Sequence, residues 1–224
     1  MKPRFVFLPL ALLLLGSPAA QAQQGHDRHH HHAAHSQAEA AVDTPATRGY
    51  KQAMATMHRD MKHGMSGNAD VDFVRQMIPH HQAAVDMARI QLAYGRDAHL
   101  KQFSRWIIFA QDIEIRFMKQ WLRGRDRGVA RQGAEDYYGA AMQQMHRAMA
   151  ISYTGDADRD FVLAMIPHHQ GAIDMAAMLI ARGVNPEIRA LANDIYRAQA
   201  SEIAWQHAWL AQYPDTPSFP TLLF

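Results

Sequence analysis

The sequence Met-Ile-Pro-His-His-Gln occurs twice, at 77–82 and at 165–170. Imidazole binds both Cu(I) and Cu(II), and thioether sulfur favours Cu(I), so this combination is typical of a copper site. On a helix, residues three and four apart share a face. We therefore predict that the motifs carry copper ligands, namely Met77, His80, His81, Met165, His168 and His169.

A second pattern, rich in Met and His, precedes each motif at a spacing that places its members on one helical stripe. The members of the two stripes are Met54, Met57, His58 and Met61, then Met142, Met145, His146 and Met149. A methionine stripe at this spacing usually packs in a core. Each of these stripes, however, contains a histidine and lies in an otherwise polar segment, so we predict that they also bind copper.

Both patterns belong to an internal repeat of 88 residues. Residues 54–122 align with 142–210 without a gap, and 30 of the 69 positions are identical. Ten of the 13 Met that follow Met1 fall at shared positions, as do six of the nine His outside the tract near the N-terminus. Retention of these two residue types in both copies indicates a requirement common to both halves.

The periodicity predicts three helical segments in each copy and no strand. The expected helices are 45–63, 70–94, 97–122, 134–150, 158–182 and 186–210. Two long helices form a hairpin in each copy, and two tandem hairpins, each preceded by a short Met/His-rich helix, predict an all-α four-helix bundle. Pro79 and Pro167 are expected to kink their helices just before the His pairs.

Glu114 and Glu202 fall on the apolar face of the last long helix of each copy. A buried carboxylate needs a partner, and His81 and His169 are the expected ones. The glutamates would then orient ligating imidazoles, although direct ligation is the alternative. Asp86 and Asp174 point away from the Met/His side of their helices and are interpreted as helix-surface acids or helix–helix contacts, not as ligands.

Residues 1–22 have the features of a secretory signal peptide, with Lys2 and Arg4, an apolar stretch and an Ala20-Gln21-Ala22 cleavage site. Export to the periplasm or the extracellular space follows, without a membrane anchor. Removal of this segment leaves 21 basic and 21 acidic residues, which argues against nucleic-acid binding. The chain has no Cys, so neither disulfides nor thiolate sites are available.

The remaining segments are expected to be a polar tail at 23–49, helical repeat 1 at 50–122, a linker at 123–133, helical repeat 2 at 134–211 and a C-terminal tail at 212–224. The polar tail is expected to be disordered and to capture copper or other divalent metals loosely through imidazoles. Those imidazoles are His26, His29, His30, His31, His32 and His35.

The motif MIPHHQ-x-A-[VI]-DMA, present in both copies, resembles the bacterial family called domain of unknown function 305. The resemblance covers roughly residues 50–211, as two tandem copies. It implies a ferritin-like helical bundle and a periplasmic copper-binding or copper-metallochaperone role. It also implies a role in copper binding for Met77, His80, His81 and their copies.

The leading hypothesis is an exported protein that sequesters, buffers or delivers copper, with a copper exporter or acceptor protein as its partner. It is not expected to be an enzyme, because the sequence has neither a phosphate loop nor a dinucleotide fingerprint. One alternative is a helical interaction module whose His sense pH. Another is a di-metal oxidase on a ferritin-like bundle, although the Glu-x-x-His motif that such sites use does not occur.

Overall fold

A computed structural model describes residues 43–61, 65–125 and 135–213 of the chain. The expected signal peptide, the His tract and most of the expected linker lie outside these ranges. The described residues form six helices and no strand. The helices are α1 (Pro45–Asp60), α2 (Ala69–Tyr94), α3 (Ala98–Leu122), α4 (Gly139–Ala148), α5 (Ala157–Arg182) and α6 (Pro186–Gln212).

Side-chain caps begin five of the six helices. Each capping side chain accepts a hydrogen bond from a backbone amide of the first turn, where the helix has no carbonyl to offer. The caps are Thr44, Asn68, Asp97, Asp156 and Asn185. These polar residues directly before apolar periodic segments explain why the predicted starts lie within a residue or two of the observed ones.

Helix α4 is the exception, because it begins at Gly139 and not near residue 134 as predicted. Asp136 Oδ1 accepts hydrogen bonds from the amides of Tyr138 (3.1 Å) and Gly139 (2.7 Å). This local turn competes with helix formation, as Asp side chains often do. The helix therefore starts only after it.

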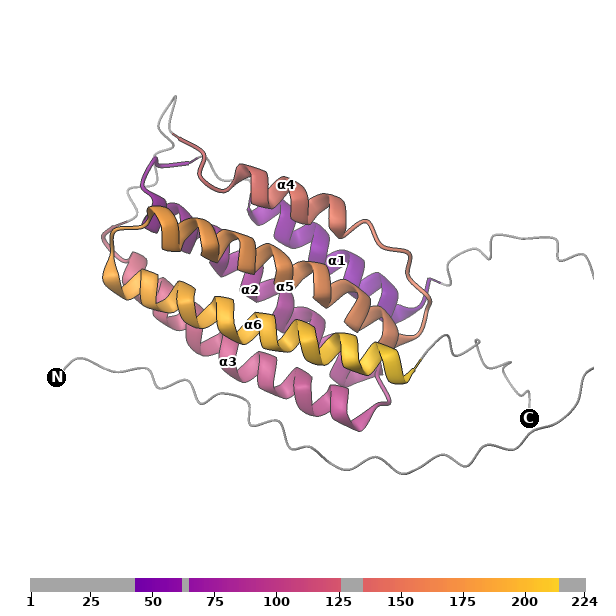
Figure 1. Cartoon of the computed structure of the whole chain (residues 1–224). Coiled ribbons are helices and arrows are strands. Elements are labelled where there is room, and N and C mark those ends of the chain that lie inside the picture. Colours follow the sequence, from indigo (N-terminus) through magenta and orange to yellow (C-terminus); the bar gives the residue numbers. More distant parts are fainter. Residues whose placement is uncertain (1–42, 62–64, 126–134, 214–224) are drawn as a thin grey trace, which may run out of the picture. The chain divides into compact units, whose positions relative to one another are not determined.

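The helices pair as two hairpins that contact each other through their first long helices (Figure 1). Helix α3 packs on α2, α6 packs on α5, and α2 packs on α5. Helix α1 lies on α2 and also contacts α5, whereas α4 lies on α5. The predicted all-α arrangement of tandem hairpins, each preceded by a shorter helix, is thus observed, while the assignment to a ferritin-like four-helix bundle stays a prediction.

Buried carboxylates join the two repeats at both hairpin turns. Asp70 at the start of α2 accepts hydrogen bonds from the amides of residues 184–185, each at 3.1 Å. Asp158 at the start of α5 accepts from the amides of residues 96–97, at 2.7 and 3.0 Å. Each repeat therefore satisfies the backbone donors of the other repeat's turn, which buried amides require.

Two buried tyrosines at equivalent repeat positions add to this connection. Tyr50 Oη donates to the carbonyl of Ala157 at 2.9 Å, and Tyr138 Oη donates to the carbonyl of Ala69 at 2.8 Å. Each ring thus packs in the core while its hydroxyl has a partner, as buried tyrosines normally do. The short helices α1 and α4 are in this way tied to the long helix of the opposite repeat.

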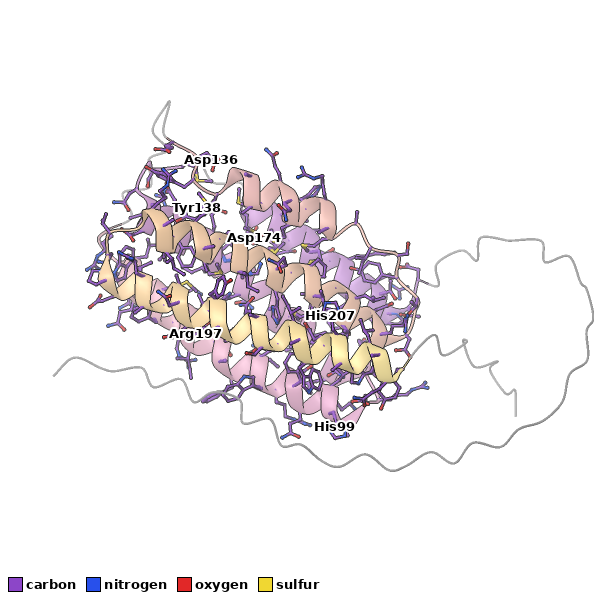
Figure 2. The ribbon with its side chains drawn as sticks, viewed as in Figure 1. His99, Asp136, Tyr138, Asp174, Arg197 and His207 are labelled. Carbon is purple, nitrogen blue, oxygen red and sulfur yellow. The ribbon has the colours of Figure 1, made fainter. Side chains whose placement is uncertain are left out.

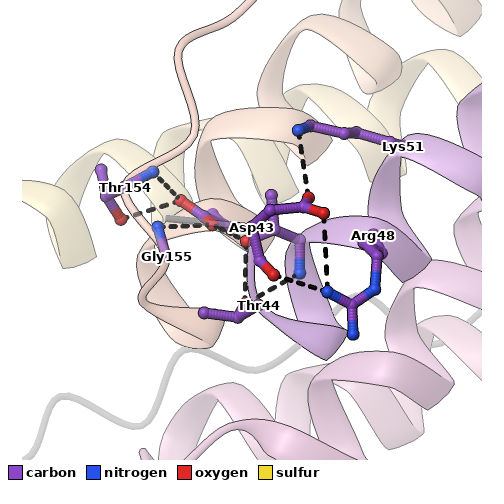
Figure 3. A network of polar contacts seen from close by, with 8 residues as sticks. Asp43, Thr44, Arg48, Lys51, Thr154 and Gly155 are labelled. Carbon is purple, nitrogen blue, oxygen red and sulfur yellow. Dashed lines mark hydrogen bonds and ion pairs between the residues drawn. The ribbon is translucent and has the colours of Figure 1, made fainter. Parts of the chain in front are cut away.

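The loop before α5 closes around a third carboxylate (Figure 3). Asp160 accepts hydrogen bonds from the amides of Thr154 and Gly155 and from the hydroxyl of Thr47 on α1. Gly155 has φ 86°, and Gly67 at the equivalent position of the first repeat has φ 79°. Only glycine adopts this left-handed backbone without strain, which explains why both copies have glycine there.

Among the helices described here, none combines the length and the apolarity needed to cross a membrane.

Candidate metal centre

The two long helices α2 and α5 meet at a pair of fully buried histidines. His80 Nε2 donates to the carbonyl oxygen of His168 at 3.0 Å, and His168 Nε2 donates to that of His80 at 3.1 Å. Their ring centres are 3.7 Å apart. A carbonyl oxygen can only accept, so Nε2 carries the proton in both rings, and each Nδ1 presents a lone pair.

The next residue in each helix is a second buried histidine that faces a glutamate of the neighbouring helix. His81 Nε2 donates to Glu114 Oε2 at 2.6 Å. His169 Nε2 and Glu202 Oε2 lie 2.9 Å apart but are not aligned for a hydrogen bond. The predicted pairing of each glutamate with a histidine is confirmed, whereas its effect on a bound metal stays a prediction.

All four imidazoles share one unusual feature, which is a buried Nδ1 atom with no hydrogen-bond partner. A buried polar atom without a partner costs about 1–3 kcal/mol, and such atoms often indicate an ion or a water. The ring centres of the consecutive histidines are 6.1 Å apart in α2 and 6.0 Å apart in α5. Two imidazoles bound to one ion through bonds of about 2.0–2.1 Å hold their centres roughly 5–6.5 Å apart, depending on the angle at the ion.

The interior keeps the central histidines in their neutral form. Burial lowers the pKa of His80 well below its ordinary value because the charged ring loses its hydration, and the nearby imidazole of His81 lowers the pKa further. Burial and the imidazole of His80 lower the pKa of His168 in the same way. Metals bind neutral imidazole, so both rings are available as ligands at neutral pH.

Methionine sulfur is present on the same helices. Met77 and Met165 are fully buried and lie one turn before His80 and His168, so that each predicted Met-His-His set lies in the core. Both helices continue through Pro79 and Pro167, so the prolines lie within the helices and do not end them. A proline inside a helix leaves the carbonyl four residues earlier without its usual donor.

Two buried polar side chains on the neighbouring helices α3 and α6 escaped sequence reasoning. Ser104 and Gln206 are fully buried, and their side chains have polar atoms without a hydrogen-bond partner. Gln206 corresponds in the repeat to Met118, so internal comparison could not distinguish it from an apolar core position. The one available signal was a polar residue on the apolar face of α6.

The two Met/His stripes are divided between core and surface. Most of their methionines pack in the core, whereas Met142 and Met149 are half-buried. A Cβ atom added at Gly171 of α5 would lie 2.4 Å from Met145 Sδ, so Met145 lies directly against that helix. The stripe histidines behave differently, because His58 of α1 and His146 of α4 contact each other, with 3.3 Å between Nε2 and Nδ1.

The six tail histidines, from His26 to His35, lie outside the described residues. Within the residues that the structure does describe, no group of three or more His, Asp or Glu side chains is arranged to hold a metal ion.

This chain is similar to one protein family and to several solved structures. The family described as "Domain of unknown function (DUF305)" matches residues 70–210. CopM in the Cu(I)-bound form is 34% identical over 65% of this chain and 98% of that chain, with a TM-score of 0.51. CopM in the Cu(II)-bound form is also 34% identical, over 64% and 97%, with the same TM-score.

A DUF305 fragment from Deinococcus radiodurans is 25% identical over 67% of this chain and 99% of that chain, with a TM-score of 0.51. A search of curated proteins finds no match.

Proposed function

This chain belongs to the DUF305 family, and from that membership we propose that it is an exported copper-binding protein that holds Cu(I) in its helical core. The observation that carries the proposal is the set of four buried, unpartnered Nδ1 atoms. A bound ion would satisfy these lone pairs. Cu(I) fits best, because imidazole and thioether ligands suit this soft ion.

Each consecutive pair of histidines would hold one ion, with His80 and His81 in the first repeat and His168 and His169 in the second. Met77 and Met165 are the candidate third ligands. The proposal therefore assigns two buried ions to one chain, in agreement with the internal repeat.

Glu114 and Glu202 have two roles in this proposal. The Glu114 carboxylate accepts from His81 Nε2, and Glu202 Oε2 lies 2.9 Å from His169 Nε2, so that Nδ1 is the atom of each ring that would face the ion. Each carboxylate also supplies a negative charge that offsets the charge of a buried cation, which would otherwise lose much hydration energy. Neither role requires the glutamate to touch the metal.

Similarity to solved structures supports a soft monovalent ion. CopM has been crystallised in Cu(I)-bound, Cu(II)-bound and Ag-bound forms, and its Cu(I)-bound form is 34% identical to this chain. Silver is bound as a soft monovalent ion, as Cu(I) is. These structures concern CopM itself, and transfer of copper binding to this chain is part of the proposal.

The wider role is export followed by sequestration, buffering or delivery of copper. The signal-like residues 1–22 would direct the chain out of the cytoplasm, and the His tract would collect Cu(II) or other divalent metals loosely. Cu(I) held by the core would pass to an exporter or acceptor protein. Neither catalysis nor nucleic-acid binding forms part of this role.

The test is a Cu(I) competition titration of the exported chain against its His81→Asn and His169→Asn variants. Each substitution should remove one of two tightly bound ions, and the double variant should lose both. His99→Asn is the matched control, because His99 is exposed on α3 (Figure 2). Equal copper content and affinity in the unchanged chain, both single variants and the double variant would overturn the proposal.

A further inference from the structure

The short helices α1 and α4 lie side by side at the histidine that each repeat carries in its Met/His stripe (Figure 1). His58 Nε2 and His146 Nδ1 are 3.3 Å apart, and their ring centres are 4.5 Å apart. His58 is half-buried and His146 is exposed. The contact therefore joins equivalent residues of the two repeats at a position that solvent can reach.

This separation suits a shared metal ion. Two metal–nitrogen bonds of about 2.0–2.1 Å that meet at a tetrahedral angle hold their nitrogen atoms about 3.3 Å apart. An ion could therefore replace the hydrogen bond without a change in the distance between the two nitrogens. The ring centres, now 4.5 Å apart, would turn outward to roughly 5 Å. For neutral rings, the proton of that hydrogen bond would move to the other nitrogen of the same ring, so both facing atoms could bind the ion.

Thioethers flank both rings. Met54 and Met61 lie four residues before and three residues after His58, and Met142 and Met149 have the same positions around His146. Residues at these spacings are neighbours on a helix surface. Met142 and Met149 are half-buried, so each has part of its side chain outside the packed core. Two imidazoles with one or two thioethers form a ligand set that favours Cu(I).

We propose that His58 and His146 bind one soft monovalent cation between them, at a site that the two repeats share. The site differs from the buried histidine pairs in the number of ions bound per chain and in its access to solvent. It takes one ion for the whole chain, and solvent or a partner protein can reach that ion through the exposed ring of His146. Only the choice of copper as the natural ion rests on the function proposed above.

The test is nitrogen NMR of the histidine side chains of the exported chain during a titration with Ag(I), which is diamagnetic. His58 and His146 should respond together, with one silver ion for the two rings. In the His58→Asn variant, His146 should respond only at an about hundredfold higher silver concentration, since linking two ligands typically gains a factor of this order in affinity. His207→Asn, a substitution at an exposed position of α6, is the matched control and should leave both responses unchanged (Figure 2).

Two results would overturn the shared site. One is an unchanged response of His146 in His58→Asn, and the other is no response of either ring while other histidines bind silver. The same spectra contain the four core histidines, so the two proposals are tested separately. Silver binding at the core without His58 and His146 would contradict only the shared site, and the reverse pattern would contradict only the buried one.

Discussion

Replacing Glu114 by Gln tests whether a buried carboxylate supports copper binding through His81. The substitution preserves the size of the side chain and an oxygen that can accept from Nε2, which now lies 2.6 Å from the carboxylate. It removes the negative charge. The ring should therefore keep its place while its hydrogen bond changes from charge-assisted to neutral.

The expected magnitude follows from that change. A hydrogen bond to a charged group contributes about 1.5–3 kcal/mol and a neutral one about 0.5–1.5 kcal/mol, so the difference is about 1–1.5 kcal/mol. The copper-free protein has the same hydrogen bond, so only the part of this difference that arises with a cation bound lowers affinity. Because the carboxylate also offsets the charge of the bound ion, we expect Cu(I) affinity to fall about tenfold, near the lower end of the effects measured for residues that orient metal ligands. Glu202→Gln should have a smaller effect, because His169 and Glu202 are not aligned for a hydrogen bond.

A Cu(I) competition titration measures this loss, with thermal unfolding of the copper-free proteins as a check on folding. Asp86→Asn is the matched control. It removes a charge from α2, where Asp86 accepts from Gln82 and Arg89 on its own helix. Unchanged affinity in Glu114→Gln, or an equal loss in Asp86→Asn, would refute the reasoning.

Three further predictions concern sulfur, the hairpin turns and pH. Met77→Leu should change the free energy of unfolding by less than about 1.5 kcal/mol while lowering Cu(I) affinity severalfold, and equal affinity in the titration would contradict a sulfur ligand. Asp158→Ala should lower the free energy of unfolding by about 3 kcal/mol, because residues 96–97 and Gln91 lose their acceptor. Thermal unfolding should then occur about 6–12 °C lower, and an unchanged midpoint would contradict the role of this contact. The copper-free protein should lose stability as the pH falls below about 6.5, the ordinary pKa of histidine. Burial lowers the pKa of His80 and His168 in the folded state, so the unfolded state binds more protons there. An equal free energy of unfolding at pH 7 and pH 5, measured with denaturant, would contradict this.

The sequence predicted the local features well because they depend on neighbouring residues. Helix α2 was expected at 70–94 and is observed at Ala69–Tyr94, since Asn68 and Gly95 limit it on either side. The pairing of Glu114 with His81 was also predicted, because both lie on apolar helical faces where a polar group needs a partner. Only α4 was clearly misplaced, since the turn at Asp136 delays its start.

Contacts between the repeats could not be predicted in the same way. Asp70 lies at the predicted start of a helix, and nothing in its local sequence indicates that its side chain accepts from amides 114 and 115 residues away. The close contact between the His80 and His168 rings depends on how α2 crosses α5. The meeting of His58 with His146 likewise depends on the packing of α1 and α4. Periodicity within one helix carries no information about such crossings.

The most direct test of copper binding in the core is nitrogen NMR of the histidine side chains of this chain, recorded before and after loading with Cu(I). The structure predicts that the Nδ1 resonances of His80, His81, His168 and His169 shift on loading, while Nε2 of each ring remains protonated. A response confined to the tail and surface histidines, with these four rings unchanged, would contradict the account.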